Sequence, residues 1–138
     1  MSVVFSNLKL NEACKEQHHL ALERGFEPQP VAVNLMLIVS ELSEALEADR
    51  QNRHADFKVF GDTYELEMSD FAGTFPNRPP AYKTAFEAGI KDTFEDELAD
   101  AFMRLMDLCG EYNIDIEKHI HMKAQYNELR PPKHGKAY

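Results

Sequence analysis

Two pairs of acidic residues, each pair three residues apart, are the side chains of this sequence best suited to chemistry. Glu41 and Glu44 form the first pair, and Glu97 and Asp100 form the second. Residues three apart lie on one side of a helix, about 5–6 Å from each other, so two packed helices would bring four carboxylates together. Such a cluster requires a cation at neutral pH, and oxygen ligands without a nearby cysteine favour Mg²⁺, Mn²⁺ or Ca²⁺ over zinc.

Projection of the helix around the first pair, at about 100° per residue, separates Glu41 and Glu44 from Glu47. Glu41 falls inside the apolar arc, Glu44 lies at its margin, and Glu47 lies on the arc that faces water. The apolar arc consists of Leu35, Leu37, Ile38, Leu42, Ala45 and Leu46. An ionised carboxylate that faces a core is unfavourable unless a cation or hydrogen-bond donors compensate it. Glu41 therefore points to a bound cation; the alternative is a core-edge glutamate that reaches a lysine or a partner chain.

The last helical segment offers the complementary charge. Lys123, Asn127 and Arg130 project within an arc of about 80° that begins with two apolar residues, Ile116 and Ile120. A cationic stripe that continues an apolar one suits an anionic ligand held beside the carboxylates. Ordinary alternatives exist, because the stripe can be the solvated end of an amphipathic helix. The aspartate of the second acidic pair can likewise form a surface ion pair with the arginine four residues later.

Four helices are expected to position these residues. Hydrophobic periodicity and helix breakers predict them, and Gly25 and the prolines at 131 and 132 end the first and the last. Asp92 and Thr93 can cap the third helix. The predicted ranges are 6–24, 31–53, 93–111 and 115–130. We therefore expect an all-α protein, an antiparallel helical bundle of about four main helices.

Residues 54–90, between the second and third predicted helices, have a different character. Their glycines, prolines and loose alternation predict an irregular insertion with a short hairpin, followed by a short helical piece near 83–88. Its aromatic side chains can form a lid that stacks on a base, or can pack on the bundle or across a subunit interface, which we favour. Those in residues 54–83 are Phe57, Phe60, Tyr64, Phe71, Phe75 and Tyr82.

Length and composition agree with a single domain over residues 1–138 and exclude several classes. The chain is 43% hydrophobic and 28% charged, with a net charge of −9, which argues against binding to a nucleic acid polymer. The sequence has no apolar run that would cross a membrane and no pattern of a signal peptide. Cys14 and Cys109 lie in helical patterns, and a buried, reduced pair in a cytoplasmic protein is the simplest interpretation.

The acidic pairs and the basic ending together resemble the MazG-like family of all-α nucleoside triphosphate pyrophosphohydrolases. The family's E-x-x-E and E-x-x-D motifs correspond to ELSE at 41–44 and ELAD at 97–100. The ending KAQYNELRPPKHGK, from residue 123, is similar to the family's ending, and His18 in QHHLALERGF stands at the family's histidine. The resemblance covers residues 6–50 and 93–138, whereas the long segment between them departs from the compact members.

The resemblance implies a reaction, a cofactor and an assembly. Mg²⁺, or Mn²⁺ in its place, would be held by Glu41, Glu44, Glu97 and Asp100, and activated water would attack the α-phosphorus with pyrophosphate leaving. The substrate would be a nucleoside triphosphate, either a deoxynucleotide or a non-canonical one, in a house-cleaning role. The family's substrate-binding positions are Lys123, Asn127, Arg130 and His18. A homodimer or homotetramer is implied as well.

Two other classes compete with this interpretation. A non-catalytic bundle that binds a partner would keep the fold without turnover. A di-metal carboxylate bundle would need two E-x-x-H motifs, and the sequence offers one, at Glu16 and His19.

Overall fold

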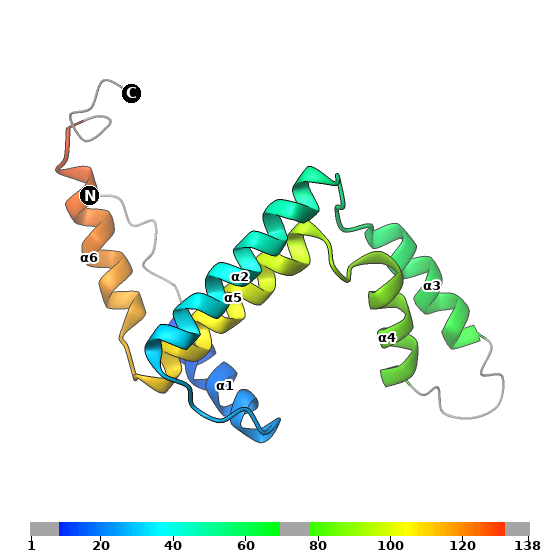
Figure 1. The fold of residues 1–138 in the computed structure, drawn as a ribbon, viewed down its shortest axis with the longest axis horizontal. Coiled ribbons are helices and arrows are strands. Elements are labelled where there is room, and N and C mark those ends of the chain that lie inside the picture. The colour runs from blue at the N-terminus through cyan, green and yellow to red at the C-terminus, as the bar shows by residue number, and fades with distance from the viewer. Residues whose placement is uncertain (1–8, 70–77, 132–138) are drawn as a thin grey trace. The chain divides into compact units, whose positions relative to one another are not determined.

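The computed structural model describes residues 9–69 and 78–131, which form six helices and no strand. None of these helices is long and apolar enough to span a membrane. An all-α fold, as predicted, is confirmed for this part of the chain (Figure 1). The helices are α1 Leu10–Glu23, α2 Val31–Arg50, α3 Phe57–Ser69, α4 Arg78–Gly89, α5 Phe94–Glu111 and α6 Ile116–Glu128.

The local signals that predicted the helix ends act as expected in most places. Gly25 follows α1 with a φ of 84°, a conformation that glycine adopts without strain. Thr93 Oγ1 accepts a hydrogen bond from the Asp96 amide at 3.3 Å before α5, and Asp115 caps α6 through the Lys118 amide at 3.2 Å. Helix α2 ends three residues before the predicted position, because Asn52 turns the chain with a φ of 53°.

The irregular segment with a short hairpin, predicted from residue 54, is wrong, because the described part of 54–90 forms two helices; the short helical piece predicted near 83–88 lies inside α4. Phe60, Tyr64 and Met68 are half-buried in α3 and lie four residues apart, which is the helical spacing and not the alternation of a hairpin. Two prolines lie in the first turn of α4, where amide groups have no helical acceptor and proline is tolerated. Phe71 and Phe75 lie outside the described residues.

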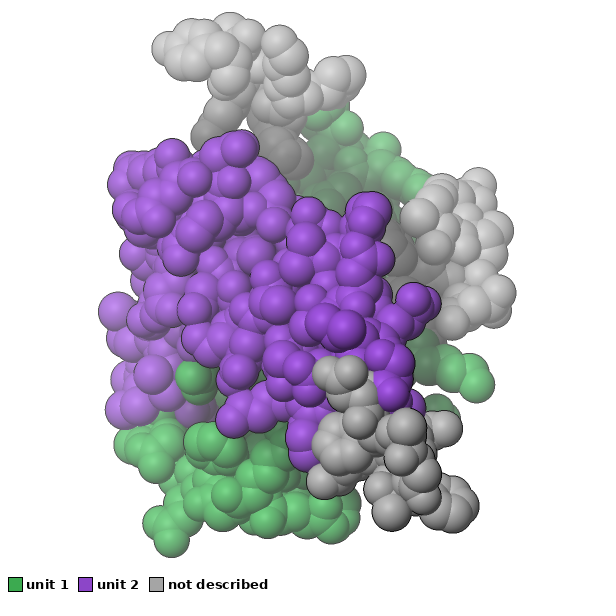
Figure 2. Space-filling view, turned by 90° about the vertical axis from the view of Figure 1, so that its right-hand side faces the viewer, with its two compact units in different colours: residues 1–31, 103–138 green, residues 32–102 purple. Residues whose placement is uncertain are grey.

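The chain divides into two compact units, which Figure 2 colours separately. Unit 1 comprises residues 1–31 and 103–138, and unit 2 comprises residues 32–102. Helix α5 therefore contributes its first half to unit 2 and its second half to unit 1.

Unit 1 is held by close contact of α5 with α1 and by hydrogen bonds from α1 to α6. Cys14 and Cys109 are buried and free, as predicted. A Cβ atom added at Gly110 would clash with the backbone oxygen of Cys14, so only glycine allows this approach. Asn11 donates its backbone amide to Glu117 Oε1 at 2.9 Å and its side-chain amide to Asp115 Oδ1 at 2.7 Å.

Unit 2 contains two helical pairs, α2 with the first half of α5 and α3 with α4 (Figure 1). The Phe94 amide donates to the Arg53 carbonyl at 2.9 Å, so α5 starts where α2 ends and the two helices run antiparallel. The buried core of the unit consists of small side chains that let helix backbones approach closely. These are Ala45, Ala48, Ala81, Ala85 and Ala101.

The two sides of the α2–α5 pair differ in chemistry. The predicted burial of Glu41 is confirmed, but most leucines of the predicted apolar arc are exposed. Helical projection places three of these leucines, with Leu98 and Phe102 of α5, on one side of the antiparallel pair, and Glu44, Asp100 and the remaining leucine, Leu37, on the other. The exposed apolar side chains are Leu35, Val39, Leu42, Leu46, Leu98 and Phe102, with 39–58% of their surface accessible.

Candidate functional site

The structure brings the predicted carboxylates of α2 and α5 together in unit 2. Glu41, Glu44 and Glu97 each offer a carboxylate oxygen, and these oxygens lie within 4.8 Å of one another. Glu41 and Glu97 are only 8% and 6% exposed, whereas Glu44 is open to solvent. Asp100 is also exposed and lines the same pocket. The arrangement has two buried carboxylates at its base and two accessible ones at its rim.

The electrostatics of this cluster favour a cation. The pKa of Glu97 is raised, first by burial and then by the negative charges of Glu44, Asp96, Asp100 and Glu41. Burial and repulsion both destabilise the ionised carboxylate, and a divalent cation between the oxygens would relieve both effects. Glu47, on the same helix, is exposed and accepts a hydrogen bond from Gln51 Nε2 at 2.6 Å, which agrees with its predicted polar position.

A second acidic group adjoins the first and shares Glu97 with it. Asp92, Asp96 and Glu97 also offer oxygens within 4.8 Å of one another. Its two aspartates, however, have local partners. Asp96 Oδ2 accepts from the Asp92 amide at 2.9 Å, and Lys91 Nζ lies 2.7 and 2.8 Å from the two oxygens of Asp92. These contacts organise the start of α5, so the first group is the better candidate for a metal site.

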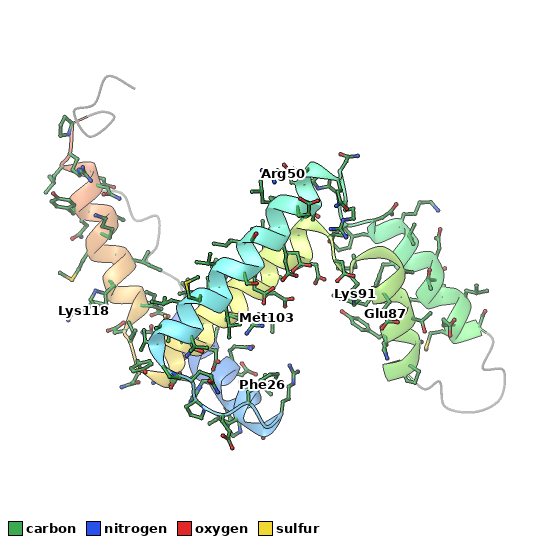
Figure 3. The ribbon with its side chains drawn as sticks, in the orientation of Figure 1. Phe26, Arg50, Glu87, Lys91, Met103 and Lys118 are labelled. Atoms are coloured by element: carbon green, nitrogen blue, oxygen red, sulfur yellow. The ribbon has the colours of Figure 1, made fainter. Side chains whose placement is uncertain are left out.

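A pocket of about 580 Å³ opens over the carboxylates, all within unit 2. This volume falls in the range of about 300–1,000 Å³ that is usual for small-molecule sites. Besides acidic residues of α2 and α5, the lining comes from α4 and the link to α5, where Figure 3 labels Glu87 and Lys91. The contributions of this α4 wall are Tyr82, Lys83, Phe86, Glu87 and Lys91.

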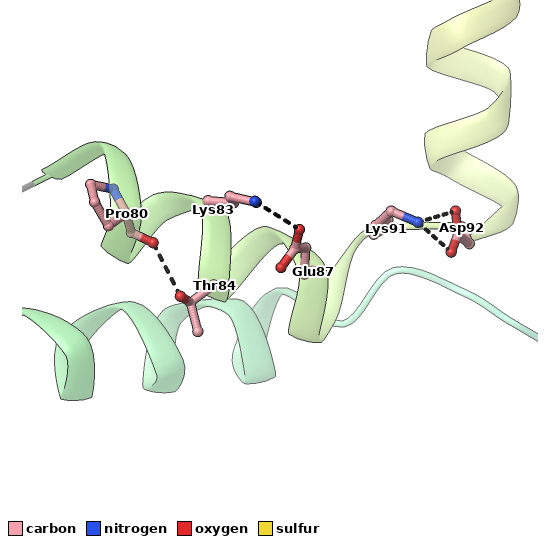
Figure 4. Close-up of polar contacts among 6 residues, drawn as sticks. All are labelled: Pro80, Lys83, Thr84, Glu87, Lys91 and Asp92. Carbon is pink, nitrogen blue, oxygen red and sulfur yellow. Dashed lines mark hydrogen bonds and ion pairs between the residues drawn. The ribbon is translucent and has the colours of Figure 1, made fainter.

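The two lysines of the α4 wall place positive charge beside the carboxylates. Lys83 Nζ lies 3.8 Å from Glu87 Oε1 along α4, and Lys91 pairs with Asp92 at the start of α5 (Figure 4). The hydrogen bond with Asp92 raises the pKa of Lys91, so this ammonium group stays charged at neutral pH. The α4 wall was not predicted from the sequence. The signal was present, because Tyr82 and Phe86, like Lys83 and Glu87, are four residues apart on one helix.

The substrate residues predicted near the C-terminal end lie in unit 1, and Lys123 and Asn127 lie on one face of α6. A hollow of about 500 Å³ is lined by Ile116, Ile120, Lys123 and Asn127, together with His119 and Ala124. Four of the five residues of the predicted stripe therefore share this face, whereas Arg130 lies beyond the end of α6 and does not line the hollow. Lys123 Nζ lies 5.0 Å from the centroid of the Tyr126 ring, and Arg130 Cζ lies 5.7 Å from it. Their role in substrate binding stays a prediction.

The histidines of α1 have local partners in unit 1. His18 Nδ1 lies 2.8 Å from Asp107 Oδ1 of α5, and its role at the substrate stays a prediction. His19 Nε2 lies 3.1 Å from Glu23 Oε1, one turn along α1. Among the described residues, neither candidate metal group includes a histidine, and thus the geometry gives no support to the E-x-x-H site considered at Glu16.

A scan against models of protein families, a search of curated proteins and a search of solved structures each find no match to this chain.

Proposed function

We propose that this chain is a metal-dependent nucleoside triphosphate pyrophosphohydrolase, as its resemblance to the MazG-like family implies. It hydrolyses a nucleoside triphosphate to the monophosphate and pyrophosphate with Mg²⁺, or Mn²⁺ in its place. The observation that carries the proposal is the convergence of three carboxylate oxygens, from Glu41, Glu44 and Glu97, within 4.8 Å of one another.

The donor set fits a hard divalent cation. All candidate ligands are carboxylate oxygens, which Mg²⁺ and Mn²⁺ prefer over softer donors. Glu41, Glu44 and Glu97 would hold the ion, and Asp100 on the rim would complete the set or bind a second ion. The raised pKa of Glu97 supports the proposal, since a bound cation would relieve the repulsion between this carboxylate and its acidic neighbours.

When bound, the ion supplies charge neutralisation of the phosphates and lowers the pKa of water. In the proposed reaction the water oxygen bonds to the α-phosphorus, and the bond from that phosphorus to the α–β bridging oxygen breaks. Pyrophosphate leaves with the bridging oxygen. A carboxylate of the cluster takes the proton from the water, and the exposed Glu44 and Asp100 are the accessible candidates.

Positive side chains complete the proposed site. Lys83 and Lys91 line the pocket with the carboxylates and are suited to hold the phosphate chain. The family resemblance assigns the same task to Lys123, Asn127, Arg130 and His18, and the proposal retains that assignment. The contact of Lys123 and Arg130 with one ring, that of Tyr126, supports it, because cation–π contacts restrict where the two charges lie.

The exposed apolar side of the α2–α5 pair supports assembly into a homodimer or homotetramer. Leu35, Val39, Leu42 and Leu46 repeat along α2 at helical spacing, which is the pattern of a helix face buried by another helix. A second copy of the chain would cover it and leave the carboxylate side free. Sedimentation of a Leu42→Glu variant should show smaller particles than the wild type; a wild-type monomer would contradict the assembly.

The test of the reaction is pyrophosphate release from canonical and modified nucleoside triphosphates, with Mg²⁺ and with EDTA. Metal-dependent release, with monophosphate as the other product, is expected from at least one substrate. Absence of release from the whole panel, by a protein that is folded, would favour the non-catalytic partner-binding bundle instead.

A further inference from the structure

The α4 wall carries two aromatic rings into the pocket that holds the carboxylates. Tyr82 and Phe86 both line it, and their rings are nearly parallel, with centroids 6.3 Å apart and an interplanar angle of 20°. Tyr82 is 55% exposed, although the neighbouring Ala81 and Ala85 are buried. The alanines therefore fix α4 in unit 2, while the rings keep an open surface toward the pocket.

Tyr82 is supported from behind by two rings of α3. Phe60 contacts it edge-on with centroids 5.3 Å apart at 74°, and Tyr64 contacts it at 6.5 Å and 78°. Such edge-to-face contacts are favourable and directional. They hold the Tyr82 ring in place before any ligand binds, which lowers the entropic cost of binding against it. The Tyr82 side chain thus packs against the rings of α3 and is at the same time exposed to the pocket.

The pocket consequently combines charged and aromatic groups, and its aromatic rings come from α4 alone. Carboxylates of α2 and α5 and the Lys91–Asp92 pair supply its ionic part, and Tyr82 and Phe86 supply an aromatic part. Figure 4 shows the order of charges along the wall, from Lys83 and Glu87 on α4 to Lys91 in the link between α4 and α5. A nucleoside triphosphate has the matching division, with a highly charged phosphate chain at one end and a planar base at the other.

We propose that Tyr82 and Phe86 form the surface on which the nucleobase stacks, so that α4 is the element of this chain that recognises the base. The inference rests on the proposed function, because it assigns the phosphate end of the same ligand to the carboxylates. Stacking reads the face of a base rather than its hydrogen-bonding edge. Recognition by this wall therefore extends to bases whose edges are modified.

Removal of the Tyr82 ring tests the proposal kinetically. Tyr82→Ala is expected to raise KM for a nucleoside triphosphate about tenfold, the scale of one stacking contact, with kcat nearly unchanged. Hydrolysis of ribose 5-triphosphate, which has no base, should be the same for both proteins. Tyr82→Phe keeps the ring and should behave as wild type. Tyr112→Ala is the matched control, because Tyr112 is a 50% exposed tyrosine that does not line the pocket.

Tyr82→Trp provides a measurement that does not depend on turnover or on the stability of the alanine variant. The chain has no tryptophan, so the introduced indole reports on this position alone. Its fluorescence should be quenched by an α,β-methylene nucleoside triphosphate, which cannot be cleaved at the α-phosphorus, and not by inorganic tripolyphosphate.

The outcomes separate this inference from the proposed function. If the wild type releases pyrophosphate but loss of the Tyr82 ring changes neither KM nor the preference over ribose 5-triphosphate, base stacking at α4 is wrong and the reaction stands. Equal quenching of the indole by tripolyphosphate and by the nucleotide analogue would also overturn it. If the wild type releases no pyrophosphate, the proposed reaction fails, while selective quenching by the nucleotide would still place a base at Tyr82.

Discussion

Helix α5 takes part in two close helix contacts, one in each unit, and they bury opposite chemistry. In unit 1 its second half meets α1 through Gly110, and the buried polar groups are the thiols of Cys14 and Cys109. In unit 2 its first half meets α2, and the buried groups are the carboxylates of Glu41 and Glu97. Burial raises the pKa of both thiols, which keeps them neutral. Bringing several ionised carboxylates close together, by contrast, is energetically unfavourable. Close packing alone explains the first contact, whereas the second brings together carboxylates whose repulsion the proposed cation would relieve.

The largest expected effect is on catalytic activity, and it follows from a substitution at the α2–α5 contact. Glu41→Gln should lower turnover at least about a hundredfold, since loss of a ligand costs no less than loss of a residue that only orients one. Its thermal stability in EDTA should equal or exceed that of the wild type, because the substitution removes a crowded charge. Pyrophosphate release and thermal unfolding measure both effects.

Glu47→Gln is the matched control for this experiment, because Glu47 lies on the same helix and is exposed. It should keep full activity. A fully active Glu41→Gln protein would contradict the proposed metal site.

A substitution at the α1–α5 contact is expected to change the free energy of unfolding. Gly110→Ala should destabilise the protein by about 2–3 kcal/mol, because its Cβ atom would clash with the Cys14 backbone oxygen and no rotamer relieves a backbone clash. Denaturant unfolding measures the change. An unchanged midpoint would show that α1 and α5 are not in close contact in solution.

A smaller effect distinguishes the lysine at the pocket from an equivalent one outside it. Lys91 and Lys58 are both exposed and each pairs with an aspartate, but only Lys91 lines the pocket. Lys91→Ala should raise KM for the triphosphate about tenfold through loss of a charged hydrogen bond, and Lys58→Ala should not change it. Similar KM values for the two variants would remove Lys91 from the site.

The smallest expected effect has the opposite sign to that of Gly110→Ala. Gly61 lies inside α3, and a Cβ atom added there would meet nothing within 4 Å. Gly61→Ala should therefore stabilise the protein by about 0.5–1 kcal/mol through helix propensity alone. A lower free energy of unfolding for this variant would argue that residues 57–69 are not helical in solution.

The sequence was most informative where chemistry and helical spacing coincide. Glu41 was assigned to the buried side of its helix and is buried there, and the cap at Thr93 was recognisable from residue type. Local signals sufficed in these places because each depends on one helix. The leucines of α2 were misassigned to the core because periodicity locates an apolar arc but does not say whether this chain or another one covers it.

The α4 wall needed information that no single segment contains. Gly61 and the loose alternation around Tyr64 obscured α3, and prolines obscured the start of α4. Even with both helices assigned, the presence of Tyr82 and Lys83 beside the carboxylates depends on tertiary packing, such as the fit of Gly89 against the backbone of Asp56 and Phe60.

The most direct test of the central claim is to follow hydrolysis of a nucleoside triphosphate with Mg²⁺ in heavy-oxygen water and to locate the label by mass spectrometry. Attack on the α-phosphorus predicts one labelled oxygen in the monophosphate, none in pyrophosphate, and no labelled product with Glu41→Gln. Label in pyrophosphate, or orthophosphate as the first product, would contradict the proposed reaction.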